Sequence, residues 1–145
     1  MKLAFLLWLA SALPQPAADQ ICLATTVYLE ARSESQVGQM AVAEVAMRRR
    51  DAGHWGSTVC SVVRAPNQFA TTTTSANFKL DNPDAWRKAW TIADRAIATW
   101  SLPIRQRRFV VPHADHFILA DSISPNWIKG PPLATIGAHN FYRIN

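Results

Sequence analysis

One segment of the chain is apolar on most sides of the helix that it would form. VGQMAVAEVAM, at positions 37–47, carries small and apolar side chains almost throughout. Such a helix has to be buried by other elements, because its surface would otherwise face water. Ser33 and Gln36 have the spacing of a capping box, and DAG at 51–53 supplies a stop signal. The pattern predicts a buried helix from about Glu34 to Arg50.

A shorter apolar helix is predicted just before it. In QICLATTVYLEA, at positions 20–31, Leu23, Val27 and Glu30 follow one another on one stripe at steps of four and three. Glu30 therefore lies on an apolar face, where a carboxylic acid loses hydration in its charged form and its pKa should rise. The short turn RSES, at 32–35, would hold Glu30 at a helix–helix junction. An acid that stays protonated near neutral pH can act as a general acid, so Glu30 is the leading catalytic candidate.

A third helix is predicted from NPDAWRKAWTIADRAIATW, at positions 82–100. Asn82 is placed to cap it, and Pro83 suits its first turn. Its apolar residues recur at steps of four, three, four and three: Trp86, Trp90, Ala93, Ile97 and Trp100. We expect this stripe to be core and not a platform for sugars.

The remaining segments predict shorter elements. A short helix at 57–64 is followed by a polar loop at 67–74 with Phe69 embedded in it, as in a ligand-facing loop. RFVV at 108–111 and HFILA at 116–120 flank PHAD, which predicts a small β-hairpin. The fold class that we expect is α+β, mainly α-helical, with the proportions of a lysozyme.

The first 18 residues have the pattern of a secretory signal peptide. One lysine is followed by an apolar run from Leu3 to Leu13, then by two prolines and small residues. The run is short for a bilayer span, which needs about 20 apolar residues, so we expect no stable membrane insertion after cleavage. Cleavage is expected after Ala12 or, preferably, after Ala18, which would leave Asp19 free to cap the next helix. The mature catalytic domain would then be residues 19–145, exported to the periplasm, cell envelope or medium.

Export affects how the two cysteines are interpreted. An oxidising compartment would let Cys22 and Cys60 form a disulfide, whereas two cysteines alone make no metal site. The alternative is two buried free cysteines.

The charge of the chain indicates an anionic partner. The net charge is +5, and without Lys2 it is +4, from 14 Lys and Arg against 10 Asp and Glu. Anionic wall polymers and nucleic acids both fit this sign, but no nucleic-acid-binding motif is present, so no specific nucleic acid is expected. The cluster at Arg48 to Arg50 falls where cations complement a helix C-terminus. We expect the protein to be a monomer.

Four blocks of sequence, in order between Ile21 and Arg143, resemble the SleB-type cell wall hydrolases, the family of spore cortex-lytic enzymes. VYLEARSESQVGQMAVAEVAMRRR is similar to the family pattern YxEARGExxxGQxAVAxVxLNR, and TVCSVVRAPNQFA to its TVCxVV and QPxQF elements. SPNW and IGAHNFY match the closing elements, with a histidine–aromatic pair before them. The chain departs from the family at Ser33, Ser35, Arg48 and Ala65.

The resemblance implies a peptidoglycan-cleaving enzyme that acts on the MurNAc–GlcNAc β-1,4 bond of the glycan strand, without a cofactor or metal. It also implies that Glu30, the first glutamate of the EAR motif, is the catalytic acid. A lytic transglycosylase needs one carboxylic acid, whereas a hydrolytic glycosidase normally uses two. The nearest second carboxylate is Glu34, which we expect to be a helix-capping charge. Hydrolysis therefore stays open.

Sugar recognition needs aromatic faces and amide or hydroxyl partners in a cleft. The candidates at matched motif positions are Tyr28, Gln68, Phe69, His116 and Trp127. Phe69 and Trp127 could instead belong to the core, and His116 could serve only as a hydrogen-bond partner for a loop.

Two other classes of protein compete with this interpretation. His113, His116 and His139, with Asp115, could be zinc ligands of an exported amidase or peptidase, although the HxxH spacing is loose and no HExxH helix is present. A basic, non-catalytic wall-binding module is the other alternative, but it leaves the position of Glu30 unexplained.

Overall fold

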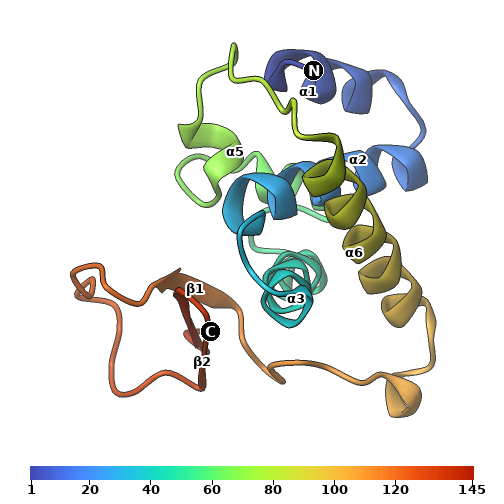
Figure 1. Ribbon diagram of the computed structural model, residues 1–145. Coiled ribbons are helices and arrows are strands. Elements are labelled where there is room, and N and C mark those ends of the chain that lie inside the picture. The colour runs from blue at the N-terminus through green and yellow to red at the C-terminus, as the bar shows by residue number, and fades with distance from the viewer.

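The computed structural model describes residues 1–145, in which helices precede a small sheet (Figure 1). The helices are α1 (Leu3–Ala12), α2 (Gln15–Ala31), α3 (Gln36–Ala52), α4 (Val59–Val63), α5 (Ala70–Thr73) and α6 (Pro83–Ser101), followed by a 3-10 turn, Ile104–Gln106. The strands are β1 (His116–Leu119), β2 (Ala134–Ile136) and β3 (His139–Tyr142). The predicted class, a mainly helical α+β fold, is confirmed.

Helix α3 lies between the other helices and the sheet, and Figure 1 shows it end-on. Its small side chains let α2 and α6 approach closely, and residues such as Val42 and Val45 are fully buried. The predicted N-terminus was wrong by two residues. Ser35, not Ser33, is the cap, because its hydroxyl accepts a hydrogen bond from the Gly38 amide at 3.2 Å. The helix ends at Ala52, before a glycine with positive φ.

Helix α2 begins at Gln15, earlier than expected. Asp19 was predicted to cap this helix, but it lies inside it and is buried. Its carboxylate accepts a hydrogen bond from the Cys60 amide at 3.3 Å, so it binds the first turn of α4 instead. The alternatives for the cysteines are settled in favour of a disulfide, which joins Cys22 on α2 to Cys60 on α4.

Helix α6 has the predicted cap, since the Asn82 side chain accepts from the Ala85 amide at 3.0 Å. The predicted core stripe was only partly correct. Trp100 is buried, but Trp86 is half-buried and Trp90 is 40% exposed. Helix α6 packs against α2 and α3, and four of the six residues that it buries are alanines: Ala85, Ala89, Ala93 and Ala96, with Ile92 and Trp100 as the other two. Close packing of the alanines leaves the wide indole rings of the first turns at the edge of the contact.

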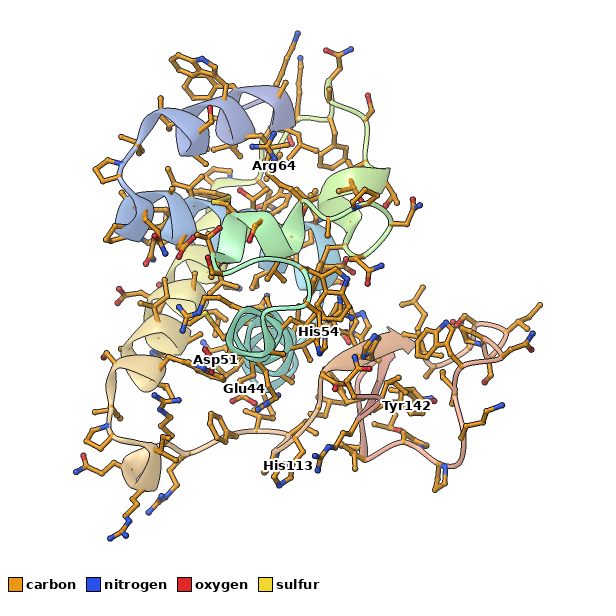
Figure 2. The ribbon with its side chains drawn as sticks, turned by 180° about the vertical axis from the view of Figure 1, so that it is seen from behind. Glu44, Asp51, His54, Arg64, His113 and Tyr142 are labelled. Atoms are coloured by element: carbon orange, nitrogen blue, oxygen red, sulfur yellow. A yellow bond between two sulfur atoms is a disulfide. The ribbon has the colours of Figure 1, made fainter.

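The sheet is antiparallel with the order β1-β3-β2. The predicted hairpin between 108–111 and 116–120 was wrong, because the first segment is irregular and β1 pairs with β3. The amides of Val110 and Val111 donate to the carboxylate of buried Glu44 on α3, at distances between 2.9 and 3.2 Å. These amides are therefore not available for a strand ladder. Figure 2 shows Glu44 on α3.

Helix α1 packs against α2 and buries Leu3, Leu6 and Ala10, while Phe5 and Trp8 are exposed. No helix of the protein combines the length and the apolar character needed to cross a membrane. The signal-peptide function of residues 1–18 stays a prediction.

Candidate active site

Glu30 lies in the last turn of α2, where α2 meets the start of α5. Its Oε1 accepts a hydrogen bond from the Ala70 amide at 2.6 Å. Ala70 is the first residue of α5, so its amide has no partner within the helix and is free to bind a side chain. The carboxyl group is thereby fixed in one orientation.

The surroundings of Glu30 favour its neutral form. Burial raises its pKa above the ordinary value of 4.5, while the Ala70 amide and the charge of Arg49 act in the opposite direction. The net shift is upward, as the sequence predicted from the apolar stripe. A carboxylic acid in this state can donate a proton at a pH where an exposed glutamate is ionised.

Glu30 lines a groove that is formed by two adjoining cavities. We call it the active-site groove. The cavity at Glu30 measures about 390 Å³ and lies between α2, the loop before α5, and strands β1 and β3. A second cavity of about 510 Å³ shares four lining residues with it: Asn67, Gln68, Phe117 and Ile118. The groove is open to solvent.

Arg49, on α3, is the cation of the groove. It is only 4% exposed, and its guanidinium lies 4.7 Å from the ring centroid of Trp55 and 4.8 Å from that of Phe69. It donates from Nε to the Asp115 carbonyl at 2.7 Å and from Nη1 to Gln68 Oε1 at 3.2 Å. Burial lowers the pKa of Arg49 to about 10, so it stays charged at neutral pH. The sequence showed Arg49 only as part of a basic cluster at a helix end, and it did not predict that this side chain is buried at the groove.

Asp115 supports the second cavity from behind its lining, because it binds three of the residues that line that cavity, His116, Ile144 and Asn145. Its carboxylate accepts from the Ile144 and Asn145 amides at 2.8 and 3.0 Å and pairs with His116 Nδ1 at 2.8 Å. Burial alone would raise the pKa of Asp115, but these three hydrogen bonds outweigh it and the pKa is lowered. Burial also lowers the pKa of His116, against the effect of Asp115, so this imidazole is favoured as a neutral ring. The pair ties the C-terminus to β1.

The structure brings most of the predicted contact residues to the groove. Gln68, Phe69, His116 and Trp127 line it, although Phe69 is almost fully buried and forms part of its floor. Trp127 is 43% exposed and lies 5.2 Å from the His116 ring, centroid to centroid. Tyr28 does not reach the groove. It precedes Glu30 by two helical positions, so it faces the core, where its hydroxyl accepts from the Asn82 amide.

Glu34 does not cap α3, contrary to the sequence-based expectation. Its Oε1 accepts from the Ala138 amide at 2.8 Å and lies 3.2 Å from His139 Nδ1. Gly137, in the same turn between β2 and β3, has φ +55, and a Cβ there would lie 2.5 Å from Glu34 Oε1. Glu34 therefore fixes this turn, and with it His139, which lines the cavity at Glu30.

We expect Gly137→Ala to lower the free energy of unfolding by about 1–3 kcal/mol. Alanine at this position would have to keep the left-handed backbone conformation, which is strained for a residue with a Cβ. Its methyl group would also displace the Glu34 carboxylate from the turn. Urea denaturation followed by circular dichroism measures the effect.

Gly130→Ala is the matched control for this variant. Gly130 also has positive φ, +88, but no atom lies within 4 Å of a Cβ built there. It should therefore show only the backbone cost, about 1 kcal/mol. Equal effects of the two substitutions would contradict the role given to Glu34.

The arrangement does not supply the zinc site considered as an alternative. His113 is exposed and points to solvent in Figure 2, while His116 and His139 line different cavities of the groove. No three His, Cys, Asp or Glu side chains lie together in a way that could hold a metal ion.

The fold and the groove together define an α+β protein with one half-buried acid in its groove. Residues 33–142 match the family described as Cell Wall Hydrolase, and this chain belongs to that family. The predicted membership, and with it an enzyme that acts on the cell wall, is confirmed.

Two solved structures are similar to most of this chain. The catalytic domain of the germination-specific lytic transglycosylase SleB from Bacillus anthracis is 26% identical, with a TM-score of 0.68 over 86% of this chain and 93% of that one. The catalytic domain of the Bacillus cereus SleB protein is 24% identical, with a TM-score of 0.63 over 86% of this chain and 89% of that one. No curated protein gives a significant match.

Proposed function

We propose that the protein cleaves the glycan strand of peptidoglycan at the MurNAc–GlcNAc β-1,4 bond as a lytic transglycosylase, with Glu30 as its single acid and base. The observation that carries this proposal is the composition of the groove. Glu30 is the one carboxylic side chain among the residues that line it. A hydrolytic glycosidase normally needs two such groups on either side of the bond. The family match begins at residue 33, so the role of Glu30 rests on this geometry.

The proposed reaction uses the Glu30 carboxyl group twice. Protonated Glu30 first donates its proton to the glycosidic oxygen, and the C1–O bond of the MurNAc residue breaks. The resulting carboxylate then takes the proton of that sugar's C6 hydroxyl, whose oxygen bonds to C1 and closes a 1,6-anhydro ring. No water is consumed, and Glu30 is protonated again. The Ala70 amide and Arg49 stabilise the intermediate carboxylate.

The substrate contacts follow from the same groove. Trp127 and His116 offer aromatic surface, and the Gln68 amide, held by Arg49, offers polar atoms for sugar hydroxyls. We further propose that the protein is exported through residues 1–18 and acts as a monomer at the cell wall. Detection of the protein outside the cytoplasm, with its N-terminus at residue 19, would support the first part.

Mass spectrometry of the reaction products tests the proposed reaction. Purified peptidoglycan is incubated with the protein, and the released fragments are analysed with and without EDTA. Fragments that end in 1,6-anhydro-MurNAc support transglycosylation, whereas fragments one water heavier would show hydrolysis instead. Loss of activity in EDTA, restored by zinc, would favour the metalloenzyme alternative. Binding without any cleavage would favour the non-catalytic module.

The pH dependence of cleavage should show an alkaline limit set by Glu30. The acid form is required for the first step, so activity falls as pH rises through the pKa of Glu30, which burial places above 4.5. The charge of Arg49 opposes this rise, so Arg49→Gln should move the alkaline limb of kcat/KM to higher pH. Initial rates between pH 4 and pH 9 measure it.

Arg49→Lys is the control, because it keeps the positive charge and should move the limb less than Arg49→Gln. An alkaline limb at the same pH in all three proteins would show that a group other than Glu30 sets it.

A further inference from the structure

Helix α6 carries an aromatic pair, of which Trp86 is half-buried and Trp90 is exposed. Trp86 and Trp90 lie one helical turn apart, with their ring centroids 6.0 Å from each other. Together with Pro83 and Arg87 they line an open cavity of about 450 Å³. The buried face of α6 is built mostly from alanines, and the ring of Trp90, which is 40% exposed, is not needed to fill the core between α6 and its neighbours. An exposed apolar patch with polar residues at its rim is typical of a binding surface.

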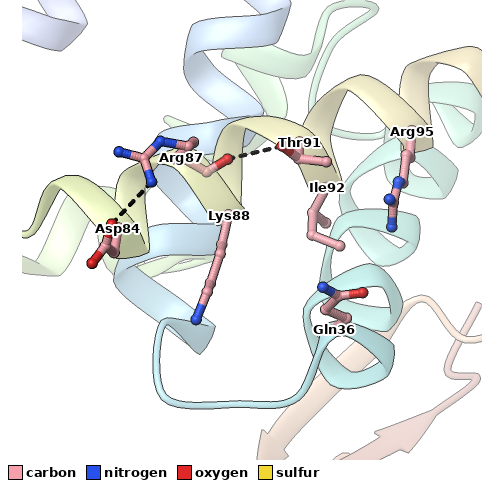
Figure 3. Close-up of a pocket in the computed structure, with 7 residues that line it drawn as sticks. All are labelled: Gln36, Asp84, Arg87, Lys88, Thr91, Ile92 and Arg95. Carbon is pink, nitrogen blue, oxygen red and sulfur yellow. Dashed lines mark hydrogen bonds and ion pairs between the residues drawn. The ribbon is translucent and has the colours of Figure 1, made fainter.

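A basic cavity of about 410 Å³ adjoins the aromatic pair (Figure 3). It lies between α6 and the start of α3, and Arg87 lines both cavities. Figure 3 shows Lys88 and Arg95 extending from α6 on the side where Gln36 of α3 lies. The lining of the cavity includes three cations, Arg87, Lys88 and Arg95, and one carboxylate, Asp84, which pairs with Arg87 at 2.9 Å. The cavity therefore has an excess of positive charge.

These two cavities, which we call the α6 surface, are separate from the active-site groove. No residue that lines the α6 surface also lines either cavity of the groove. The groove is built from the end of α2, the loop before α5 and the sheet, whereas the α6 surface is built from α6 and Gln36. A ligand on the α6 surface would leave Glu30 accessible.

The combination of groups selects the chemistry of the ligand. Indole rings offer flat, amphipathic faces against which the apolar face of a sugar ring can pack. Arginine and lysine bind carboxylates, and arginine can do so with two hydrogen bonds. A glycan with carboxylates attached close to its sugars would fit both parts of the surface at once, and glycan strands bearing peptide stems have this chemistry.

We propose that the α6 surface is a second peptidoglycan-binding site, with a sugar ring against Trp86 and Trp90 and stem-peptide carboxylates at Arg87, Lys88 and Arg95. This inference rests on the proposed substrate class. A second attachment to the same polymer raises the effective concentration of substrate at the groove, without any change in the chemistry at Glu30. The site thus holds the enzyme on the insoluble wall between cleavage events.

Binding of the full chain to insoluble peptidoglycan tests the site. All variants are made in a Glu30→Gln background, so that the wall is not consumed during the measurement. Trp90→Ala should weaken binding by about threefold to tenfold, since an aromatic contact is lost. Lys88→Glu with Arg95→Glu should weaken it at least as much at low salt and less at high salt, because salt screens exposed charges. Sedimentation of the wall with bound protein measures the affinity.

The controls change the same properties elsewhere on the surface. Arg105→Glu with Arg108→Glu alters the net charge equally, at exposed positions outside both cavities. Ile104→Ala removes another exposed apolar side chain, one that is 78% exposed. Both should bind the wall like the parent protein, and circular dichroism shows whether each variant is folded. Trp86 is left unchanged because its ring also packs against Tyr28.

Insoluble chitin, a β-1,4-linked GlcNAc polymer that carries neither stem peptides nor carboxylates, separates the two parts of the site. On this glycan the charge-reversal variant should bind as well as the parent, whereas Trp90→Ala should still bind more weakly. Wall binding unaffected by Trp90→Ala, or weakened equally by the Arg105 and Arg108 changes, would overturn the proposal. That result leaves the proposed function standing as long as the wild-type protein releases anhydro products, so the two failures are distinguishable.

Discussion

Replacing Glu30 with glutamine is expected to lower the rate of peptidoglycan cleavage by about 10²–10⁴-fold. Glutamine keeps the shape of the side chain and can still accept the hydrogen bond of the Ala70 amide, but it has no proton of the required acidity. The loss should appear in kcat, because proton transfer belongs to the transition state and not to binding. Release of soluble fragments from purified walls, quantified by chromatography, gives the rate.

Glu44→Gln is the matched control for this experiment. Glu44 is a second acid whose pKa is raised by burial, but it holds the Val110 and Val111 amides and does not line the groove. Its variant should lose stability while the folded fraction keeps its activity. Full activity in the Glu30→Gln protein would show that another group supplies the proton.

The stability of Glu30→Gln provides a second check. Because the folded state holds the pKa of Glu30 above 4.5, ionisation costs stability progressively as pH rises from the unfolded pKa through the folded one. The variant lacks this cost. Its free energy of unfolding, relative to wild type, should therefore increase between pH 4 and neutral pH. A decrease over that range would contradict the upward shift.

The sequence predicted the helical part of the fold because its signals are local. The apolar interior of α3, the Asn82 cap of α6 and the stripe that leads to Glu30 each depend on residues within a few turns of one another. The predicted helix boundaries differ from the observed ones by a few residues where two neighbouring side chains could each have served as the cap. Ser35 replaced Ser33 as a cap because its hydroxyl, and not that of Ser33, reaches the amide three residues on.

The sheet and much of the groove could not be predicted, because they depend on contacts between distant segments. Val110 and Val111 have strand-like sequence, yet their amides bind Glu44, more than 60 positions earlier. The burial of Arg49 likewise requires Asp115 and Gln68 to be brought together around it. No periodicity in the sequence carries this information. The prediction at Trp90 failed for a related reason, since the alanines beside it set how closely α6 packs.

The disulfide is a contact between distant segments that also helps to hold Glu30 in place. Cys22 is two turns before Glu30 on α2, and Cys60 lies on α4, just before the loop that carries Gln68 to Ala70. The bond therefore fixes the start of the segment whose Ala70 amide binds Glu30. Asp19 strengthens the same junction through the Cys60 amide.

Removal of this bond is expected to lower the free energy of unfolding by about 3–4 kcal/mol. The bond closes a loop between residues 38 positions apart, and its loss gives the unfolded chain more conformational freedom. Thermal unfolding of the Cys22→Ala, Cys60→Ala protein measures the effect against wild type. Wild-type protein treated with dithiothreitol should fall to a similar midpoint, whereas the double variant should not respond to the reductant. An unchanged midpoint in wild-type protein whose thiols are shown to be free by alkylation would mean that the non-covalent contacts between α2 and α4, including Asp19, hold the junction alone.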